Sequence, residues 1–185
     1  MNLKNLPHMP DAAARRDRCV ALDRARRGVD GAVLPAQSAT GTQGFLEGLL
    51  KAAPFKMAKI LTDNDQAFTD RCGATGQRAP TGQHPFDRVG AAHAIAHRLI
   101  TPRHPQTNGR VARCNGRLAE VLATHRCHSG EHLHDTLIRN VSIDHHHIPQ
   151  RARGHVSPVA ARQEWHQKKP DLFHSDVNNL PGLDI

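Results

Sequence analysis

Residues 105–118, PQTNGRVARCNGRL, form a polar segment that leads directly into a helix and decides how the chain folds. Apolar residues recur at helical spacing from Asn108 to about His128, so the sequence predicts its longest helix here. Thr107 or Asn108 can supply the N-cap. A junction of this kind usually presents something to a ligand, yet this one contains no acidic residue. The apolar stripe consists of Val111, Cys114, Leu118, Val121, Leu122 and His125.

The elements on either side of this helix follow from hydrophobic periodicity and from turn residues. One of the predicted strands, 29–34, is a poor candidate because Asp30 and Gly31 interrupt it. Strands come first, then alternating helices and strands, then helices, which predicts an α/β domain with a mixed sheet flanked by helices. We expect strands at 18–24, 29–34, 57–63 and 97–100, helices at 43–52, 85–96, 130–143 and 157–165, a loop at 64–84 and a polar surface strap from Pro170.

The composition is that of a basic protein with few aromatic residues. The formal charge of +8 and the isoelectric point near 10 favour a polyanionic partner, above all nucleic acid. No apolar run is long enough to span a membrane, and residues 1–18 lack the apolar centre of a secretory signal. The four cysteines show no paired spacing, which suits a reducing cytosol. Aromatic residues make up only 3%, which indicates a thin, alanine-rich core or a damaged one.

Several segments together resemble DDE-type insertion-sequence transposases. ILTDNDQAFTDR (60–71) resembles the LTDNG-x-EF strand end of that family, and HRLITPRHPQTNGRVARCNGRL (97–118) resembles its PQTNG-x-VER-x-NG loop and helix start. HHHIPQRARGHVSPVAA (145–161) resembles the family's NHHIPQRALGHISPVEA ending. NLKNLP (2–7) and VALDRARR (20–27) match its first two core strands, so the likeness covers nearly the whole chain. The resemblance implies a ribonuclease-H-like α/β core, which these bacterial enzymes share with retroviral integrases.

The resemblance also implies how the chain is divided. Residues 1–128 correspond to the integrase-like catalytic core, and residues 129–185 to a helical C-terminal extension and tail. The family usually carries an N-terminal helix-turn-helix region that reads the terminal repeats of the element. This sequence starts at the first core strand, so we expect that reader and its sequence specificity to be absent.

Three carboxylates converge in this family to hold a pair of Mg²⁺ or Mn²⁺ ions, and the resemblance finds only one of them here. Asp63 is the acid at the end of the fourth strand, but Asn2 and Ala112 occupy the positions of the other two. Hard divalent ions need several oxygen ligands to activate a nucleophile and stabilise a leaving oxygen. We therefore expect Asp63 to bind metal weakly at best, and we expect no strand transfer by this member of an enzyme family.

Other acids do not replace the lost ones, and further departures from the family pattern indicate a decayed copy. Glu120 lies about 12 Å further along the predicted helix than Ala112, from the rise of 1.5 Å per residue. Asp23 matches an ordinary position in the second strand. The family has Gly and Glu at the positions of Asp65 and Ala67, commonly Phe at those of Cys114 and Cys127, and Tyr-Asn near Asp144 and His145.

Basic and polar residues flank the expected acid site and are candidates for DNA binding. Basic side chains can neutralise phosphates, and backbone amides at the helix start near Asn108 can add an anion site. The other interpretation is that these residues are the solvated face of an amphipathic helix and its capping loop. The resemblance favours DNA as the partner, bound by a homo-oligomer or by a mixed oligomer with an intact transposase. The candidates are Lys4, Arg103, His104, Gln106, Asn108, Arg110, Arg113, Asn115 and Arg117.

Fifteen histidines, including the run His145, His146 and His147, raise the alternative of a zinc-binding protein. Zinc sites need ligands that converge from suitable spacings. Consecutive histidines point in different directions, and the pair His93 and His97 spans a change from helix to strand. The sequence therefore favours solvated or hydrogen-bonded histidines. A protein without a role also remains open at this point.

Overall fold

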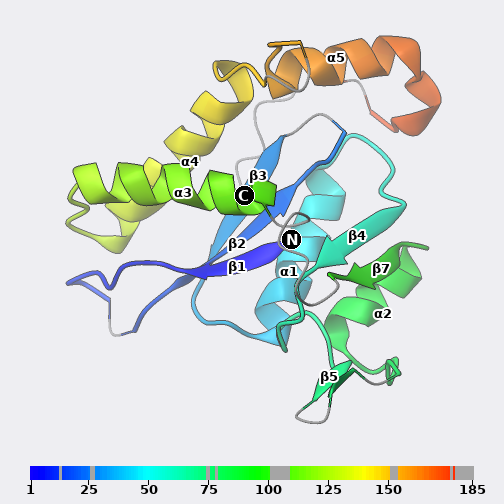
Figure 1. The fold of residues 1–185 in the computed structure, drawn as a ribbon, viewed down its shortest axis with the longest axis horizontal. Coiled ribbons are helices and arrows are strands. Elements are labelled where there is room, and N and C mark those ends of the chain that lie inside the picture. Colours follow the sequence, from blue (N-terminus) through cyan, green and yellow to red (C-terminus); the bar gives the residue numbers. More distant parts are fainter. Residues whose placement is uncertain are drawn as a thin grey trace.

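The computed structural model describes residues 1–12, 14–25, 28–73, 76–77, 79–100, 109–150, 154–175 and 177, and only the backbone of residues 72, 73, 76, 77, 110 and 112. Within these ranges the chain is a mixed α/β fold with helices on both sides of the strands (Figure 1). The expected fold class is confirmed.

The strands form an antiparallel group and a parallel pair that lie side by side. In the antiparallel group β2 is central, with β1 and β3 on its two sides, and β4 pairs with β7 in parallel. The nitrogen of Met1 donates to the carbonyl of Leu61 at 2.5 Å, which brings the start of β1 against β4. The strands thus follow one another in the order β3, β2, β1, β4, β7 (Figure 1). Their bounds are β1 Asn2–Asn5, β2 Asp17–Leu22, β3 Val29–Leu34, β4 Lys59–Thr62 and β7 Ala96–Leu99.

The expectation that 29–34 would make a poor strand was wrong. β3 pairs with β2 along its whole length, and Gly31 lies opposite Val20. A Cβ at position 31 would lie 3.2 Å from Nε of Arg18, so the glycine leaves room for that buried side chain. Asp30 is also buried. Tertiary packing on β3 therefore overrides the weak β propensity of these two residues.

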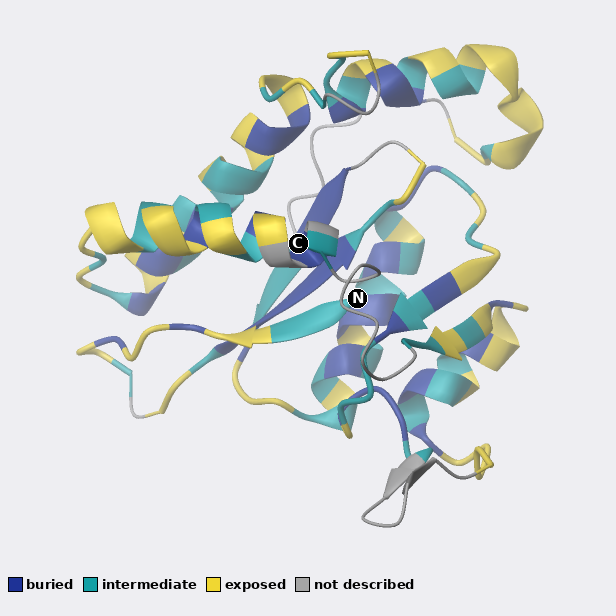
Figure 2. Cartoon of the chain, viewed as in Figure 1, coloured by how far each residue is buried: buried dark blue, intermediate teal, exposed yellow. Residues whose placement is uncertain are grey.

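Side chains of β2 alternate between two layers of helices, as the pleat of a strand requires. Cys19 and Ala21 belong to the main core with Phe45 and Leu46 of α1, whereas Val20 packs with Cys114 of α3. Figure 2 shows buried residues concentrated on the strands and on the inner faces of the helices. The helices are α1 Ala39–Ala52, α2 Pro85–Ala92, α3 Gly109–Thr124, α4 Gly130–His146 and α5 Pro158–Lys168.

Helix ends differ from the predicted ones where a local contact decides the boundary. α1 begins at Ala39 rather than 43 because the Ser38 hydroxyl accepts a hydrogen bond from the amide of Gly41 at 3.1 Å. α2 ends at Ala92 rather than 96 because Ala94 has a φ of 54°. α3 ends at Thr124, earlier than expected, and α4 continues to His146.

The main core contains three of the six aromatic residues in the chain. Phe68 and Phe86 meet edge to face with ring centroids 5.4 Å apart, and Phe45 lies in the same cluster. The core is therefore less thin than the composition indicated. A second cluster joins the segment after β1 to α3 and α4, and its buried members are Leu6, Met9, Leu118, Leu133 and Leu137.

The C-terminal strap follows the segment that leaves α1. The short 3₁₀ helix η3 (Pro170–Leu172) is followed by Phe173, which meets Phe55 edge to face at 6.3 Å. Backbone hydrogen bonds join Lys56 to Leu172 and His174 to Pro54 at 2.8 and 2.9 Å. The predicted loop 64–84 also contains a small antiparallel ladder of β5 (Cys72–Gly73) and β6 (Gly76–Gln77).

Candidate functional site

The residues at two of the three expected acid positions meet where the start of β1 lies beside the end of β4. Asp63 follows directly on β4, and Asn2 is the first residue of β1. Nδ2 of Asn2 donates a hydrogen bond to Oδ2 of Asp63 at 2.6 Å. Because a carboxylate can only accept hydrogen bonds, the amide nitrogen must be the atom that faces it. Oδ1 of Asp63 is buried and has no hydrogen-bond partner among the described residues.

Burial raises the pKa of the Asp63 carboxyl above its ordinary value. A hydrogen bond from the backbone amide of Asp65, the positive charge of the Met1 amine and the Asn2 amide lower this pKa, and the negative charge of Asp65 raises it. Burial outweighs the groups that lower it. The Asn2 amide and the Asp65 backbone amide thus both act on a half-buried carboxylate whose Oδ1 accepts no hydrogen bond from the described residues.

A buried hydrogen-bond network holds the end of β4 just before Asp63. Nε2 of His97 lies 2.8 Å from the Thr62 hydroxyl, and Nδ1 lies 2.6 Å from Oδ1 of Asp87. The same Asp87 oxygen accepts from Nη2 of Arg71 at 2.9 Å. The Thr-His-Asp arrangement resembles a catalytic triad, but Thr62 is 0% exposed and no substrate can reach its hydroxyl. The network therefore supports the strand end, and the spacing of these residues in the sequence does not reveal it.

The third expected acid position lies in α3. Ala112 belongs to the described backbone of that helix, as does Arg110, but neither side chain is described. Of the acids weighed as substitutes, Glu120 is exposed on α3, and Oδ1 of Asp23 accepts a hydrogen bond from the amide of Ala25. Arg103, His104, Gln106 and Asn108 lie outside the described residues.

The remaining DNA-binding candidates have different surroundings. Lys4 is exposed on β1, and Arg113 is exposed on α3, where its Nε donates to the Gly109 carbonyl at 3.4 Å. Arg117 is 42% exposed but forms a salt bridge with the buried Asp144 at 2.7 Å. Oδ1 of Asn115 is buried and has no partner among the described residues. Lys4 and Arg113 are thus the described cations best placed for an outside ligand.

Asp144 and the first residue of the histidine run, His145, fix α4 to the sheet. Asp144 faces Arg117 and the charge of Arg18, which is only 2% exposed on β2. Burial raises the pKa of Asp144 and lowers that of Arg18. Nε2 of His145 accepts from the amide of Val29 at 2.8 Å. Across the described ranges no three His, Cys, Asp or Glu side chains are grouped so that they could hold a metal ion.

Comparison with solved structures identifies the architecture. The catalytic core domain of BIV integrase superposes with a TM-score of 0.64 at 18% identity, over 91% of this chain and 96% of that one. A simian T-cell lymphotropic virus intasome in complex with PP2A regulatory subunit B56 gamma gives a TM-score of 0.59 at 15% identity, over 97% of this chain and 56% of that one. The chain has an integrase-core fold.

Among the comparisons with known proteins, only those with solved structures found matches. No protein-family model and no curated protein matches the sequence. In the part of the chain that the structure describes, no helix combines the length and the apolar character needed to cross a membrane.

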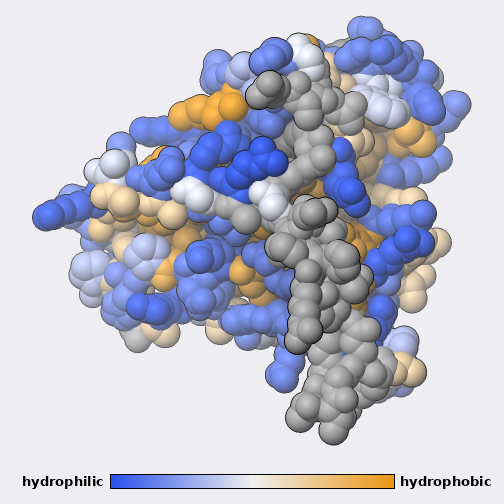
Figure 3. Space-filling view, in the orientation of Figure 1, coloured by the Kyte–Doolittle hydropathy of each residue, from blue (hydrophilic) through white to orange (hydrophobic). Residues whose placement is uncertain are grey.

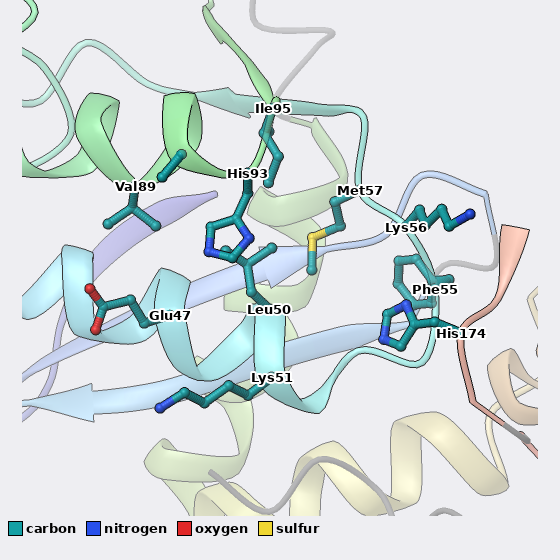
Figure 4. Close-up of a pocket in the computed structure, with 11 residues that line it drawn as sticks. Glu47, Leu50, Lys51, Phe55, Lys56, Met57, Val89, His93, Ile95 and His174 are labelled. Atoms are coloured by element: carbon teal, nitrogen blue, oxygen red, sulfur yellow. The ribbon is translucent and has the colours of Figure 1, made fainter.

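A groove of about 580 Å³ opens elsewhere on the integrase-like core, between α1, α2 and the C-terminal strap (Figure 4). Its apolar side chains include Leu50, Met57 and Val89, and the polar ones include Lys51 and His93. None of the residues that line it belongs to the expected acid or DNA-binding sets.

Proposed function

We propose that this chain is a catalytic-core protein of a bacterial insertion-sequence transposase that binds DNA without cutting or joining it. The observation that carries the proposal is the contact between Asn2 and Asp63, because an amide donates where the family has a second metal-binding carboxylate. The integrase fold supports DNA as the partner, and one structural neighbour was solved as an intasome. The motifs of residues 60–71 and 97–118 favour the bacterial element family over a viral one.

The residues present do not fit a pair of Mg²⁺ or Mn²⁺ ions. A two-metal site needs several oxygen ligands around both ions. Here Asp63 offers one carboxylate, Asn2 directs its NH₂ group toward that carboxylate, and alanine at position 112 has no donor atom. We therefore propose that the chain does not bind these ions stably.

A nicking and strand-transfer assay on duplex DNA in Mg²⁺ and in Mn²⁺ tests the loss of activity. We expect no turnover from the wild-type chain. The double variant Asn2→Asp/Ala112→Glu restores the family's carboxylate set, and any activity it gains should disappear when Asp63→Asn is added. Turnover by the wild type that Asp63→Asn abolishes contradicts the proposal.

DNA binding is supported by the net charge of +8 and by exposed cations near the strand edge and α3. Hydrophilic side chains lie among less polar ones on the visible surface over α3 (Figure 3). Binding through phosphates releases counterions, so affinity must fall steeply as salt rises.

Fluorescence anisotropy with a labelled duplex at several salt concentrations measures this affinity. We expect the logarithm of the association constant to fall linearly with the logarithm of salt, and Arg113→Glu to weaken binding at every salt concentration. Arg88→Glu makes the same charge change on an exposed residue of α2 and serves as the control. Equal losses from both variants indicate only a general charge effect, and no binding at low salt removes DNA as the partner.

The oligomeric state decides between two forms of this function. A homo-oligomer would bind DNA alone, whereas a mixed oligomer with an intact transposase would inhibit that enzyme. Addition of the wild-type chain to an active transposase from the same element separates the two, because only the mixed oligomer lowers strand transfer when DNA is in excess.

A further inference from the structure

We propose that Asn2 takes the place of a divalent cation as the group that stabilises the Asp63 carboxylate, so that the fold has become independent of metal. The inference rests on the proposed function in one respect: positions 2 and 63 correspond to two of the family's metal-binding acids. In addition to being a lost metal ligand, Asn2 is here a hydrogen-bond donor that stabilises Asp63.

A buried carboxylate needs hydrogen bonds or a counter-charge, since transfer from water is costly without them. In an acid cluster the counter-charge is the cation, and two carboxylates in close contact repel each other without it. Between positions 2 and 63 the contact distance is 2.6 Å, so an aspartate at position 2 would place two carboxylates within this distance. An asparagine has nearly the same shape and turns this contact into a hydrogen bond.

The two oxygens of the Asp63 carboxylate differ in their surroundings. Oδ2 accepts from Asn2, whereas Oδ1 is buried and has no partner among the described residues. Buried polar atoms are normally satisfied in native proteins. One oxygen each of Asp87 and Asp144 is in the same state, so the inference follows from the contact that Oδ2 of Asp63 makes with Asn2.

The same strand contains a second pair of this kind. Nδ2 of Asn5 donates to Oδ1 of Asp17 at 2.9 Å, where β1 and β2 pair. An asparagine on β1 that satisfies an aspartate on a neighbouring segment is therefore a contact that this sheet already uses without metal.

Thermal unfolding of the wild type and four variants in EDTA and in MnCl₂ or MgCl₂ tests the proposal. The wild-type midpoint should be the same with and without metal. Asn2→Asp should lower the midpoint in EDTA, and Mn²⁺ should recover part of the loss. The exchange Asn2→Asp/Asp63→Asn keeps one amide and one carboxylate, so its midpoint should lie close to that of the wild type and ignore metal. Asn2→Ala should be less stable to the same extent in EDTA and in Mn²⁺.

Two results overturn the inference. One is a wild-type midpoint that rises with Mn²⁺ in a saturable way and loses this response in Asp63→Asn. The other is an exchange variant that is as unstable in EDTA as Asn2→Asp, because the amide and carboxylate would then not act as a pair. Neither result depends on DNA. A wild type that is insensitive to metal but fails to bind DNA refutes the proposed function and leaves this inference standing.

Discussion

At the scale of single residues, the buried Arg18 side chain fits only because Gly31 has no side chain. It lies opposite Val20 on β2, and the Arg18 guanidinium occupies the space above it. A Cβ there would lie 3.2 Å from Nε of Arg18 and 3.3 Å from the carbonyl oxygen of Cys19. Because the carbonyl belongs to the backbone, it cannot move away freely.

Gly31→Ala should therefore lower the free energy of unfolding by about 1–3 kcal/mol, the usual cost of overpacking. Gly44→Ala is the matched control, since Gly44 lies exposed in α1 and a Cβ at this position would meet nothing within 4 Å. That control should raise the free energy of unfolding by about 0.5–1 kcal/mol, because alanine favours a helix. Urea denaturation measures both, and equal effects of the same sign contradict the packing argument.

Protonation of His97 makes the stability of the fold depend on pH. Its side chain is 4% exposed, and burial lowers its pKa below the ordinary value of 6.5 although the hydrogen bond and charge of Asp87 act to raise it. The positive charge of Arg71, which pairs with the same Asp87 oxygen, lowers the pKa of His97 further. The unfolded chain thus binds a proton more readily than the folded protein.

The contribution of His97 to the free energy of unfolding should be greatest above pH 6.5. It should decrease as the pH falls from 6.5 toward the lower pKa of His97 in the folded state. His97→Gln should flatten this part of the profile even if it lowers stability overall. His125→Gln, at an exposed histidine, should leave the slope unchanged. Denaturation at several pH values gives the slopes, and an unaltered slope in His97→Gln contradicts the assignment.

At the scale of elements, α4 is held to the sheet by polar contacts at its C-terminal end. Asp144 is 8% exposed and pairs with Arg117 of α3, while His145 accepts from the β3 backbone. Position 144 was expected to mark decay, as a departure from the family's aromatic residue. The structure instead gives its side chain an ion pair with a neighbouring helix and the charge of Arg18 beneath it.

Asp144→Ala should lower the free energy of unfolding by about 3 kcal/mol, because it removes a carboxylate charge that the buried Arg18 faces. Arg117→Ala should cost about 1 kcal/mol or less, since that side chain is 42% exposed and water can replace it. Chemical denaturation of both variants tests the ranking. If Arg117→Ala lowers the free energy of unfolding more than Asp144→Ala does, Asp144 is stabilised mainly by Arg117 of α3 and not by Arg18 of the sheet.

At the scale of the whole molecule, the strap from Pro170 closes the side of the fold on which the chain leaves α1. Phe173 contacts Phe55 and the ring of His166, and two backbone hydrogen bonds tie the strap to residues 54 and 56. Segments more than a hundred positions apart in the sequence thereby become neighbours.

Phe173→Ala should lower the free energy of unfolding by about 1–2 kcal/mol and expose the strap to proteases, because half-buried aromatic contacts are lost. Leu172→Ala removes an exposed side chain next to it and should do neither. Limited proteolysis followed by mass spectrometry locates the first cleavage. Equal cleavage of both variants contradicts the role of the ring.

Much of the architecture could be predicted from the sequence because it depends on local patterns. The stripe of apolar residues predicted α3, the strand pattern predicted β2 and β4, and the helix expected at 157–165 corresponds to α5. Helix ends and β3 were less predictable, since a single cap, a positive φ or the packing of Arg18 decides them.

The chemical identity of the candidate site was determined by the sequence alone: asparagine at position 2, aspartate at 63 and alanine at 112 exist before any folding. Only the tertiary structure decided what these residues do to one another. Asn2 meets Asp63 across 61 positions and His97 meets Thr62 across 35, and periodicity carries no information about such distant partners. Burial makes each of these contacts matter for stability, because a polar group removed from water costs free energy unless folding provides a hydrogen-bond partner.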